Sequence, residues 1–230
     1  MKYSFVLLSA GKGLRFGKAT PKQYLSLAGK PMIVHILENI DRLDAIDETI
    51  IVCHPDYETT IKNYLSEYRI TKKTIIVCGG ETRQDSVYNG LKAASCENII
   101  LHEAARPLVS AEDFQALIDC PHDNVSYTYS IPYTVLKKSE DDHISDILNR
   151  NELVNIQLPQ KFVKADLAFA HEQAKKDGVV FTEDAGLLFK YSGKQIYCLN
   201  GKNYNIKITE YSDMLFAETL YKEEILKESL

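Results

Sequence analysis

Short apolar runs alternate along the chain with longer segments in which apolar residues recur at helical spacing. The runs are rich in β-branched residues and apolar on both sides, which is typical of strands buried in a parallel sheet. In the first longer segment, Ile33, Ile36 and Ile40 share one face of a helix. The pattern predicts strands over residues 4–9, 49–53, 74–78, 98–101, 124–131 and 195–199. It predicts helices over residues 31–43, 56–68, 84–94, 165–176, 183–191 and 212–226.

The order of these elements predicts an α/β fold. Strands and helices alternate through the first half of the chain, which implies right-handed crossovers and a mostly parallel sheet with helices on both faces. We expect one domain over residues 1–230. The polar segment 132–151 lacks helical periodicity. It is either an arm or hairpin outside the main sheet, or a long surface loop.

Composition and charge exclude several classes of protein. The chain has 27 Lys and Arg against 32 Asp and Glu, a net charge of −5, which argues against a nucleic-acid partner. Its 5 cysteines are far apart and form no C-x-x-C pair, so neither a disulfide framework nor a zinc site is predicted. The apolar run 5–8 is too short for a signal peptide or a membrane span. We therefore expect a cytoplasmic protein with no membrane partner.

The connection after the first predicted strand is strongly basic. No Asp or Glu precedes Glu38, and Gly11, Gly13 and Gly17 allow the backbone to turn and present N–H groups to an anion. The segment matches neither the P-loop nor the dinucleotide fingerprint. We expect a nucleoside triphosphate to lie across it, held in part by the cations Lys12, Arg15, Lys18 and Lys22.

Two further connections follow predicted parallel strands, where open α/β sheets bind ligands. Gly79 and Gly80 permit close backbone approach, and Ser86 in the next helix can donate a hydrogen bond. Beyond the next strand, Glu103 can hold Mg²⁺ or a hydroxyl while Arg106 holds a phosphate, or the two form a local ion pair.

A single cation, Lys207, stands in the apolar and strand-like run 203–209 near the C-terminus. Either this lysine points into a site, or it lies on an edge strand and faces solvent. The sequence pattern alone leaves both interpretations open.

Together these segments resemble the cytidylyltransferases that activate small polyol phosphates, whose members make CDP-methylerythritol for isoprenoids and CDP-ribitol for surface polymers. The resemblance covers nearly the whole chain in order. The matching motifs are Ala10-Gly11-x-Gly13-x-Arg15-Phe16-Gly17, Pro21-Lys22-Gln23-Tyr24-Leu25, Gly79-Gly80-x-x-Arg83-x-Asp85-Ser86-Val87-x-Asn89-Gly90-Leu91, His102-Glu103-Ala104-Ala105-Arg106-Pro107, Arg150-Asn151, Pro159-Gln160-x-Phe162 and Asn205-Ile206-Lys207-Ile208-Thr209.

The resemblance implies a Rossmann-like nucleotidyltransferase fold that transfers CMP from CTP to a polyol phosphate and releases pyrophosphate. It implies Mg²⁺ bound mainly through the CTP phosphates, with no protein metal ligand. It also implies a homodimer with a shared active site, in which an arm at about residues 132–151 embraces the partner and Arg150 reaches the neighbouring site.

The resemblance also assigns roles to individual residues. The catalytic residues it implies are Arg15, Lys22 and Lys207. The nucleotide-binding residues are Ser9, Ala10, Gly11, Gly13, Gly79, Gly80, Arg83, Ser86 and Ala104. The substrate-binding residues are Glu103, Arg106, Arg150 and Thr182.

The chain departs from the family pattern at Ser9, usually Ala, at Glu103, usually Asp, and at Leu158, usually Thr. The acceptor stays open between 2-C-methyl-D-erythritol 4-phosphate and D-ribitol 5-phosphate, because Tyr204 resembles ribitol-type members and Asp85-Ser86-Val87 resembles methylerythritol-type members. Two alternatives remain: a nucleotidyltransferase for another sugar or polyol phosphate, and an inactive nucleotide-binding homologue.

Overall fold

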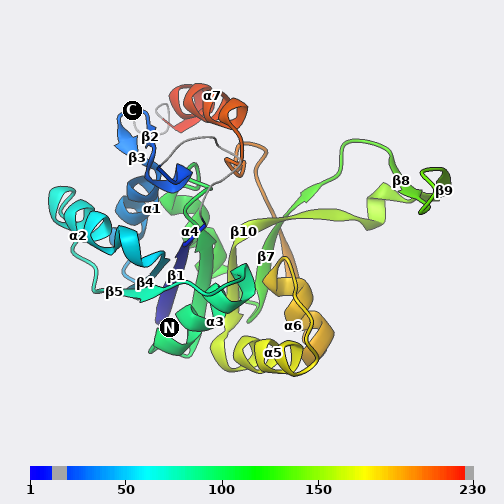
Figure 1. Ribbon diagram of the computed structural model, residues 1–230, viewed down its shortest axis with the longest axis horizontal. Coiled ribbons are helices and arrows are strands. Elements are labelled where there is room, and N and C mark those ends of the chain that lie inside the picture. The colour runs from blue at the N-terminus through cyan, green and yellow to red at the C-terminus, as the bar shows by residue number, and fades with distance from the viewer. Residues whose placement is uncertain (12–19, 226–230) are drawn as a thin grey trace.

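A seven-stranded sheet lies between two layers of helices in the computed structural model, which describes residues 1–11 and 20–225 (Figure 1). The strand order is β11-β7-β10-β6-β1-β4-β5, and β10 runs antiparallel to both of its neighbours while the other pairs are parallel. The predicted mostly parallel sheet is confirmed. The strands are β1 (Tyr3–Ser9), β4 (Ile46–Cys53), β5 (Thr74–Cys78), β6 (Asn98–Glu103), β7 (Val125–Ser130), β10 (Val154–Val163) and β11 (Tyr197–Asn200).

Helices cover both faces of the sheet because successive side chains of a strand point to opposite sides. On β1, Phe5 and Leu7 pack with α1, α2 and α4, whereas Val6 packs with α3, α5 and α6. A third cluster joins α7 to the short ribbon of β2 (Ser26–Leu27) and β3 (Lys30–Pro31). The helices are α1 (Met32–Asp41), α2 (Glu58–Glu67), α3 (Arg83–Ala93), α4 (Ala111–Asp119), α5 (Lys164–Lys176), α6 (Asp184–Ser192) and α7 (Tyr211–Leu220). Among the described residues, no helix has the length and apolar character needed to cross a membrane.

Helix α4, strand β10 and the short ribbon of β2 and β3 were not predicted from the sequence. Helix α4 begins with a capping box, in which Ser110 accepts from the backbone N–H of Asp113 and Asp113 accepts from that of Ser110. Strand β10 contains Pro159, which has no backbone N–H and argues against a strand in the sequence. Its pairing with β7 changes register between Gln157 and Gln160. The last predicted helix is shorter than expected, since α7 ends at Leu220 and a π-helical turn (Tyr221–Ile225) follows it.

The polar segment 132–151 contains a hairpin that projects from the body of the molecule (Figure 1). Strands β8 (Val135–Lys138) and β9 (Ile144–Leu148) pair with each other and not with the main sheet. A 3-10 turn, η4 (Arg150–Glu152), then leads into β10. The segment is therefore a projecting hairpin and not a long surface loop.

Candidate active site

A cavity of about 680 Å³ opens at the carboxyl ends of β1, β4, β5 and β6. The parallel register places Ser9 beside Cys53 and Cys53 beside Cys78, so the connections that follow these strands meet at one edge of the sheet. The described residues that line the cavity are Leu8, Ser9, Ala10, Gly11, Lys22, Gln23, His54, Pro55, Gly79, Gly80, Glu81, Thr82, Arg83, Ser86, Glu103, Ala105, Lys207 and Thr209. The three connections singled out in the sequence, together with Lys207, therefore form one site.

The turn after β5 packs too tightly for side chains at its two glycines. A Cβ at Gly79 would lie 2.4 Å from the Cβ of Ala10, and one at Gly80 would lie 2.2 Å from the Cβ of Asp85. The Gly80 N–H donates to Ser86 Oγ at 3.0 Å, and this hydroxyl donates in turn to the Thr82 carbonyl at 3.0 Å. Ser86 therefore shapes the turn at the cavity wall, in addition to any contact with a ligand.

The end of β1 is held by the short 3-10 turn η2 (Lys22–Tyr24). Gln23 Nε2 donates to the carbonyls of Ser9, at 2.6 Å, and Gly11, at 2.9 Å. Lys22 lines the cavity from the same turn. The other residues of this connection that were predicted to bind the triphosphate lie outside the described residues: Lys12, Gly13, Arg15, Gly17 and Lys18.

Glu103, the last residue of β6, joins two cations on the cavity wall. Its Oε1 accepts from Arg83 Nε at 2.8 Å, and its Oε2 lies 2.5 Å from Lys207 Nζ. The loop that carries Lys207 is not a strand, but the Ile208 N–H donates to the Ala105 carbonyl at 2.8 Å and fixes it beside the end of β6. Lys207 points into the site, so the edge-strand interpretation is wrong.

The two cations keep Glu103 charged despite its burial. Glu103 is 7% exposed, and burial disfavours its carboxylate, but Arg83 and Lys207 lower its pKa to about 2. Because Glu103 is buried and held by Arg83 as well, it keeps the Lys207 ammonium in a fixed position at the cavity wall. Such a fixed cation suits charge that develops on a phosphate.

Glu103→Gln should reduce stability at neutral pH and make the protein less sensitive to acid. Because the pKa of Glu103 is below its ordinary value of 4.5, its carboxylate stabilises the fold above that value, and this contribution is lost as the pH falls towards about 2. The difference in unfolding free energy between wild type and variant should therefore be largest at neutral pH and shrink in acid. Urea denaturation across this range measures it, and a difference that does not change with pH would contradict the assignment.

Two residues predicted beside Glu103 face other parts of the protein. The Ala104 side chain is fully buried, and its N–H donates to the Leu8 carbonyl at 3.0 Å. Arg106 donates from Nη1 to the Asn205 carbonyl at 2.8 Å and is not among the residues that line the cavity. The local ion pair of Glu103 with Arg106, considered from the sequence, is replaced by pairs of Glu103 with Arg83 and Lys207.

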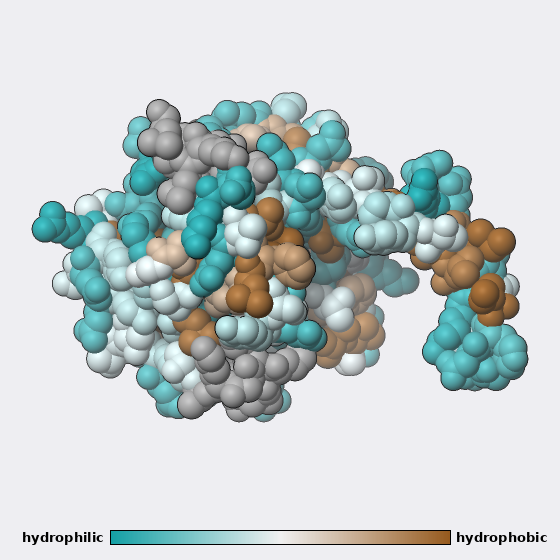
Figure 2. All heavy atoms as spheres, turned by 90° about the horizontal axis from the view of Figure 1, so that it is seen from above, coloured by the Kyte–Doolittle hydropathy of each residue, from teal (hydrophilic) through white to brown (hydrophobic). Residues whose placement is uncertain are grey.

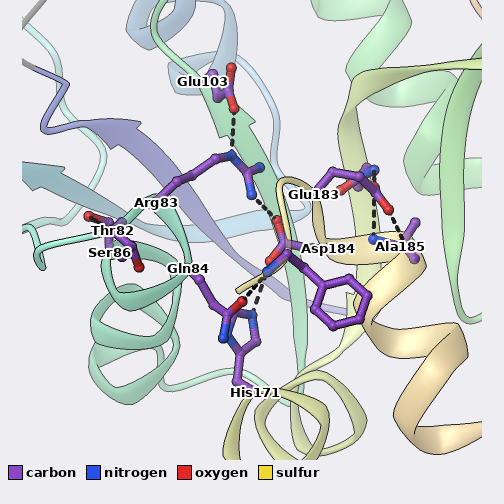
Figure 3. A network of polar contacts seen from close by, with 12 residues as sticks. Thr82, Arg83, Gln84, Ser86, Glu103, His171, Glu183, Asp184 and Ala185 are labelled. Atoms are coloured by element: carbon purple, nitrogen blue, oxygen red, sulfur yellow. Dashed lines mark hydrogen bonds and ion pairs between the residues drawn. The ribbon is translucent and has the colours of Figure 1, made fainter. Parts of the chain in front are cut away.

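Besides Arg106, two more predicted substrate-binding residues do not line this cavity. Arg150 lies at the base of the arm, where its Nη1 donates to the Pro132 carbonyl at 2.6 Å. Thr182 is exposed and lies just before α6. Sequence reasoning missed Gln23 and Asp184 as residues that hold the site in place. Gln23 does so through the contacts given above, and Asp184 accepts from Arg83 Nη1 at 2.6 Å (Figure 3).

Comparison with known proteins identifies the family. A sequence model of 2-C-methyl-D-erythritol 4-phosphate cytidylyltransferase matches residues 4–223. The chain belongs to this family. A curated member from Clostridium botulinum (strain Langeland / NCTC 10281 / Type F) is 35% identical, over 96% of this chain and 98% of its own. Another from Geobacillus kaustophilus (strain HTA426) is also 35% identical, over 96% of this chain and 97% of its own.

Solved structures of the family share the fold described above. The crystal structure of 4-diphosphocytidyl-2C-methyl-D-erythritol synthase from Anaerococcus prevotii DSM 20548 superimposes with a TM-score of 0.85 at 29% identity, covering 96% of this chain and 97% of its own. Membership of this cytidylyltransferase family makes the chain a CTP-dependent nucleotidyltransferase with a Rossmann-like fold.

Proposed function

We propose that the protein transfers the cytidylyl group of CTP to the phosphate of 2-C-methyl-D-erythritol 4-phosphate and releases pyrophosphate. The observation that carries this proposal is the pair of Lys207 and Glu103 inside a cavity that the glycine turn at Gly79 and Gly80 also lines. Lys207, a cation able to bind phosphate, thus lies in the same cavity as Gly79 and Gly80, where a planar base can approach the backbone closely. The family of the chain supports CTP as the donor.

The reaction needs charge neutralisation and positioning more than proton transfer. An oxygen of the acceptor phosphate, already an anion at neutral pH, attacks the α-phosphorus of CTP in line. The bond from this phosphorus to the β-phosphate oxygen breaks, and pyrophosphate carries the charge away. Lys207 contacts the α-phosphate and the incoming phosphate, while Lys22, together with Arg15, holds the triphosphate and stabilises the leaving oxygens.

The residues around the cavity suit a magnesium ion carried by CTP. Among the described residues, no group of three or more His, Cys, Asp or Glu side chains is arranged to hold a metal. Mg²⁺ typically keeps several waters and binds substrate phosphates with at most one or two carboxylates. Of the carboxylates that line the described part of the cavity, Glu103 is already paired through both oxygens with Arg83 and Lys207, which leaves Glu81. When bound, the ion would neutralise charge on the phosphate oxygens.

The nucleoside half of CTP lies against the turns after β1 and β5. Backbone groups of Ala10, Gly11, Gly79 and Gly80 line this part of the cavity, and the tight packing of Gly79 on Ala10 holds the two turns together. Backbone N–H and C=O groups at fixed positions can distinguish a pyrimidine from a purine by size and hydrogen bonding.

The arm pairs two chains into a homodimer with shared active sites. Its few apolar side chains are exposed, with Ile144 at 70% and Ile147 at 74%, and Figure 2 shows apolar spheres gathered on the projecting arm next to polar ones. A hairpin this exposed buries little apolar surface in its own chain. We therefore expect a second copy of the chain to pack against its apolar side chains. Arg150 at the base of the arm then binds the acceptor phosphate in the partner's site.

The acceptor is tested by pyrophosphate release from CTP with a panel of polyol phosphates. We expect turnover with 2-C-methyl-D-erythritol 4-phosphate at least about 10-fold faster in kcat/KM than with D-ribitol 5-phosphate. Faster turnover with ribitol phosphate would contradict the proposed acceptor. No release with any acceptor, from protein that binds CTP, would identify an inactive homologue.

A further inference from the structure

A line of paired polar side chains runs from the cavity into the protein interior. Beyond Glu103, the Arg83 guanidinium donates from Nη1 to Asp184 Oδ2 at 2.6 Å, and the other oxygen of Asp184 lies 3.0 Å from His171 Nε2 (Figure 3). Asp184 is 1% exposed and His171 is 2% exposed. Neither residue lines the cavity, so neither contacts a ligand bound there. Lys207, Glu103, Arg83, Asp184 and His171 are therefore connected in that order.

The backbone around Asp184 is itself fixed. Asp184 is the first residue of α6, and the preceding Glu183 caps this helix by accepting from the Ala185 N–H at 3.0 Å. Gln84, next to Arg83 in the first turn of α3, accepts from the Phe181 N–H at 2.7 Å. The carboxylate that receives Arg83 is thus placed by the helix to which it belongs, and by a second contact from α3.

The two carboxylates together determine the orientation of the guanidinium. Arg83 uses Nε for Glu103 and Nη1 for Asp184, and a planar guanidinium held at two edges has one orientation. Its Nη2 is buried with no hydrogen-bond partner, so the contacts of Nε and Nη1 are the ones that orient the group. Burial disfavours the charged form of Asp184, but Arg83 and His171 keep its pKa below the ordinary value.

We propose that Asp184, held in place by His171, is a positioning residue for acceptor binding that acts through Arg83 on the carboxylate of Glu103. The inference rests on the proposed function, in which the acceptor phosphate binds beside Lys207, the cation that Glu103 holds. Without the Asp184 charge, the buried guanidinium keeps one carboxylate partner and shifts towards it, which moves Glu103 and Lys207 away from the acceptor. CTP keeps its contacts with Lys22 and with the backbone at Ala10, Gly11, Gly79 and Gly80, none of which belongs to this line, so its binding changes much less than that of the acceptor.

Asp184→Asn tests the inference through the two Michaelis constants. We expect the KM of the acceptor to rise about 10- to 100-fold, while the KM of CTP changes by less than about 2-fold. The matched control is Glu48→Gln, since Glu48 is also a fully buried carboxylate, paired with Lys73 at 2.8 Å, but lies outside the cavity lining. This control should lose stability and leave both Michaelis constants unchanged.

A folded Asp184→Asn protein with an unchanged acceptor KM, or with both constants raised equally, would overturn the inference. If this variant does not fold, His171→Leu replaces it, with an expected rise in acceptor KM of about 3- to 10-fold, and an unchanged value there would overturn the inference too.

A measurement that does not need turnover separates this inference from the proposed function. The Nε–H signal of Arg83 in nitrogen-15 NMR, assigned with Arg83→Lys, should shift and exchange faster with water in Asp184→Asn than in wild type. An unchanged signal would overturn the positioning role even if the wild type is active. Wild-type protein that releases no pyrophosphate would instead contradict the proposed function, and the NMR result would still decide whether Asp184 orients Arg83.

Discussion

Lys207→Ala is expected to lower the rate of CMP transfer at least about 100-fold without unfolding the protein. The ammonium is held 2.5 Å from Glu103 at the cavity wall, where the proposed function places the α-phosphate on which charge increases during attack. Truncation removes this charge but leaves the loop attached, because the backbone of Ile208 still donates to Ala105. Steady-state kinetics of pyrophosphate release, with thermal unfolding as the test of folding, measure the effect, and Lys22→Ala should behave in the same way.

Lys202→Ala is the matched control for this experiment. Lys202 lies in the same loop, but its Nζ is 5.8 Å from the centre of the Tyr204 ring, and it does not line the cavity. We expect near-normal kcat and KM for this variant. Near-normal rates for Lys207→Ala as well would remove Lys207 from the catalytic residues.

Mixing two inactive variants should restore activity if the active site is shared between chains. The Arg150→Ala chain has a normal cavity but no arginine at the base of its arm. The Lys207→Ala chain has a normal arm but lacks the lysine in its cavity. In a heterodimer, one of the two sites has a normal cavity and receives a normal arm. With random exchange of subunits, half of the dimers are heterodimers with one good site each, so the mixture should regain about a quarter of wild-type activity.

Subunit exchange must be shown independently, for example by native mass spectrometry of chains with different isotope labels. A mixture of Arg150→Ala with Arg150→Ala,Lys207→Ala is the control, since neither of its chains supplies a normal arm, and it should stay inactive. If exchange is complete and the first mixture also stays inactive, each site is built from a single chain.

The sequence predicts the centre of the sheet well because those strands are buried on both faces. The runs over residues 4–9 and 49–53 are continuous and β-branched, and they correspond to β1 and β4. Strand β10 has no such signal, since its buried positions include the polar side chains of Gln160 and Lys161. A pattern of apolar and polar residues does not show that a polar residue is buried when its partners come from distant parts of the chain.

Part of the candidate site could also be predicted from the sequence, and part could not. The convergence of Gly79, Glu103 and the first connection could be predicted, because all follow parallel strands whose carboxyl ends share one edge of the sheet. The ion pair of Arg83 with Asp184 spans 101 residues of sequence and depends on how α6 packs beside α3. Tertiary packing sets that contact, and no local motif indicates it.

Binding of CTP to the wild-type protein in the presence of Mg²⁺, measured by isothermal titration calorimetry, tests the central claim most directly. The account predicts one CTP per chain, with ATP and GTP bound at least about 10-fold more weakly, because the proposed contacts of the base with the backbone at Gly79 and Gly80 select a pyrimidine. No heat of CTP binding, or equal affinity for the purine triphosphates, would contradict it.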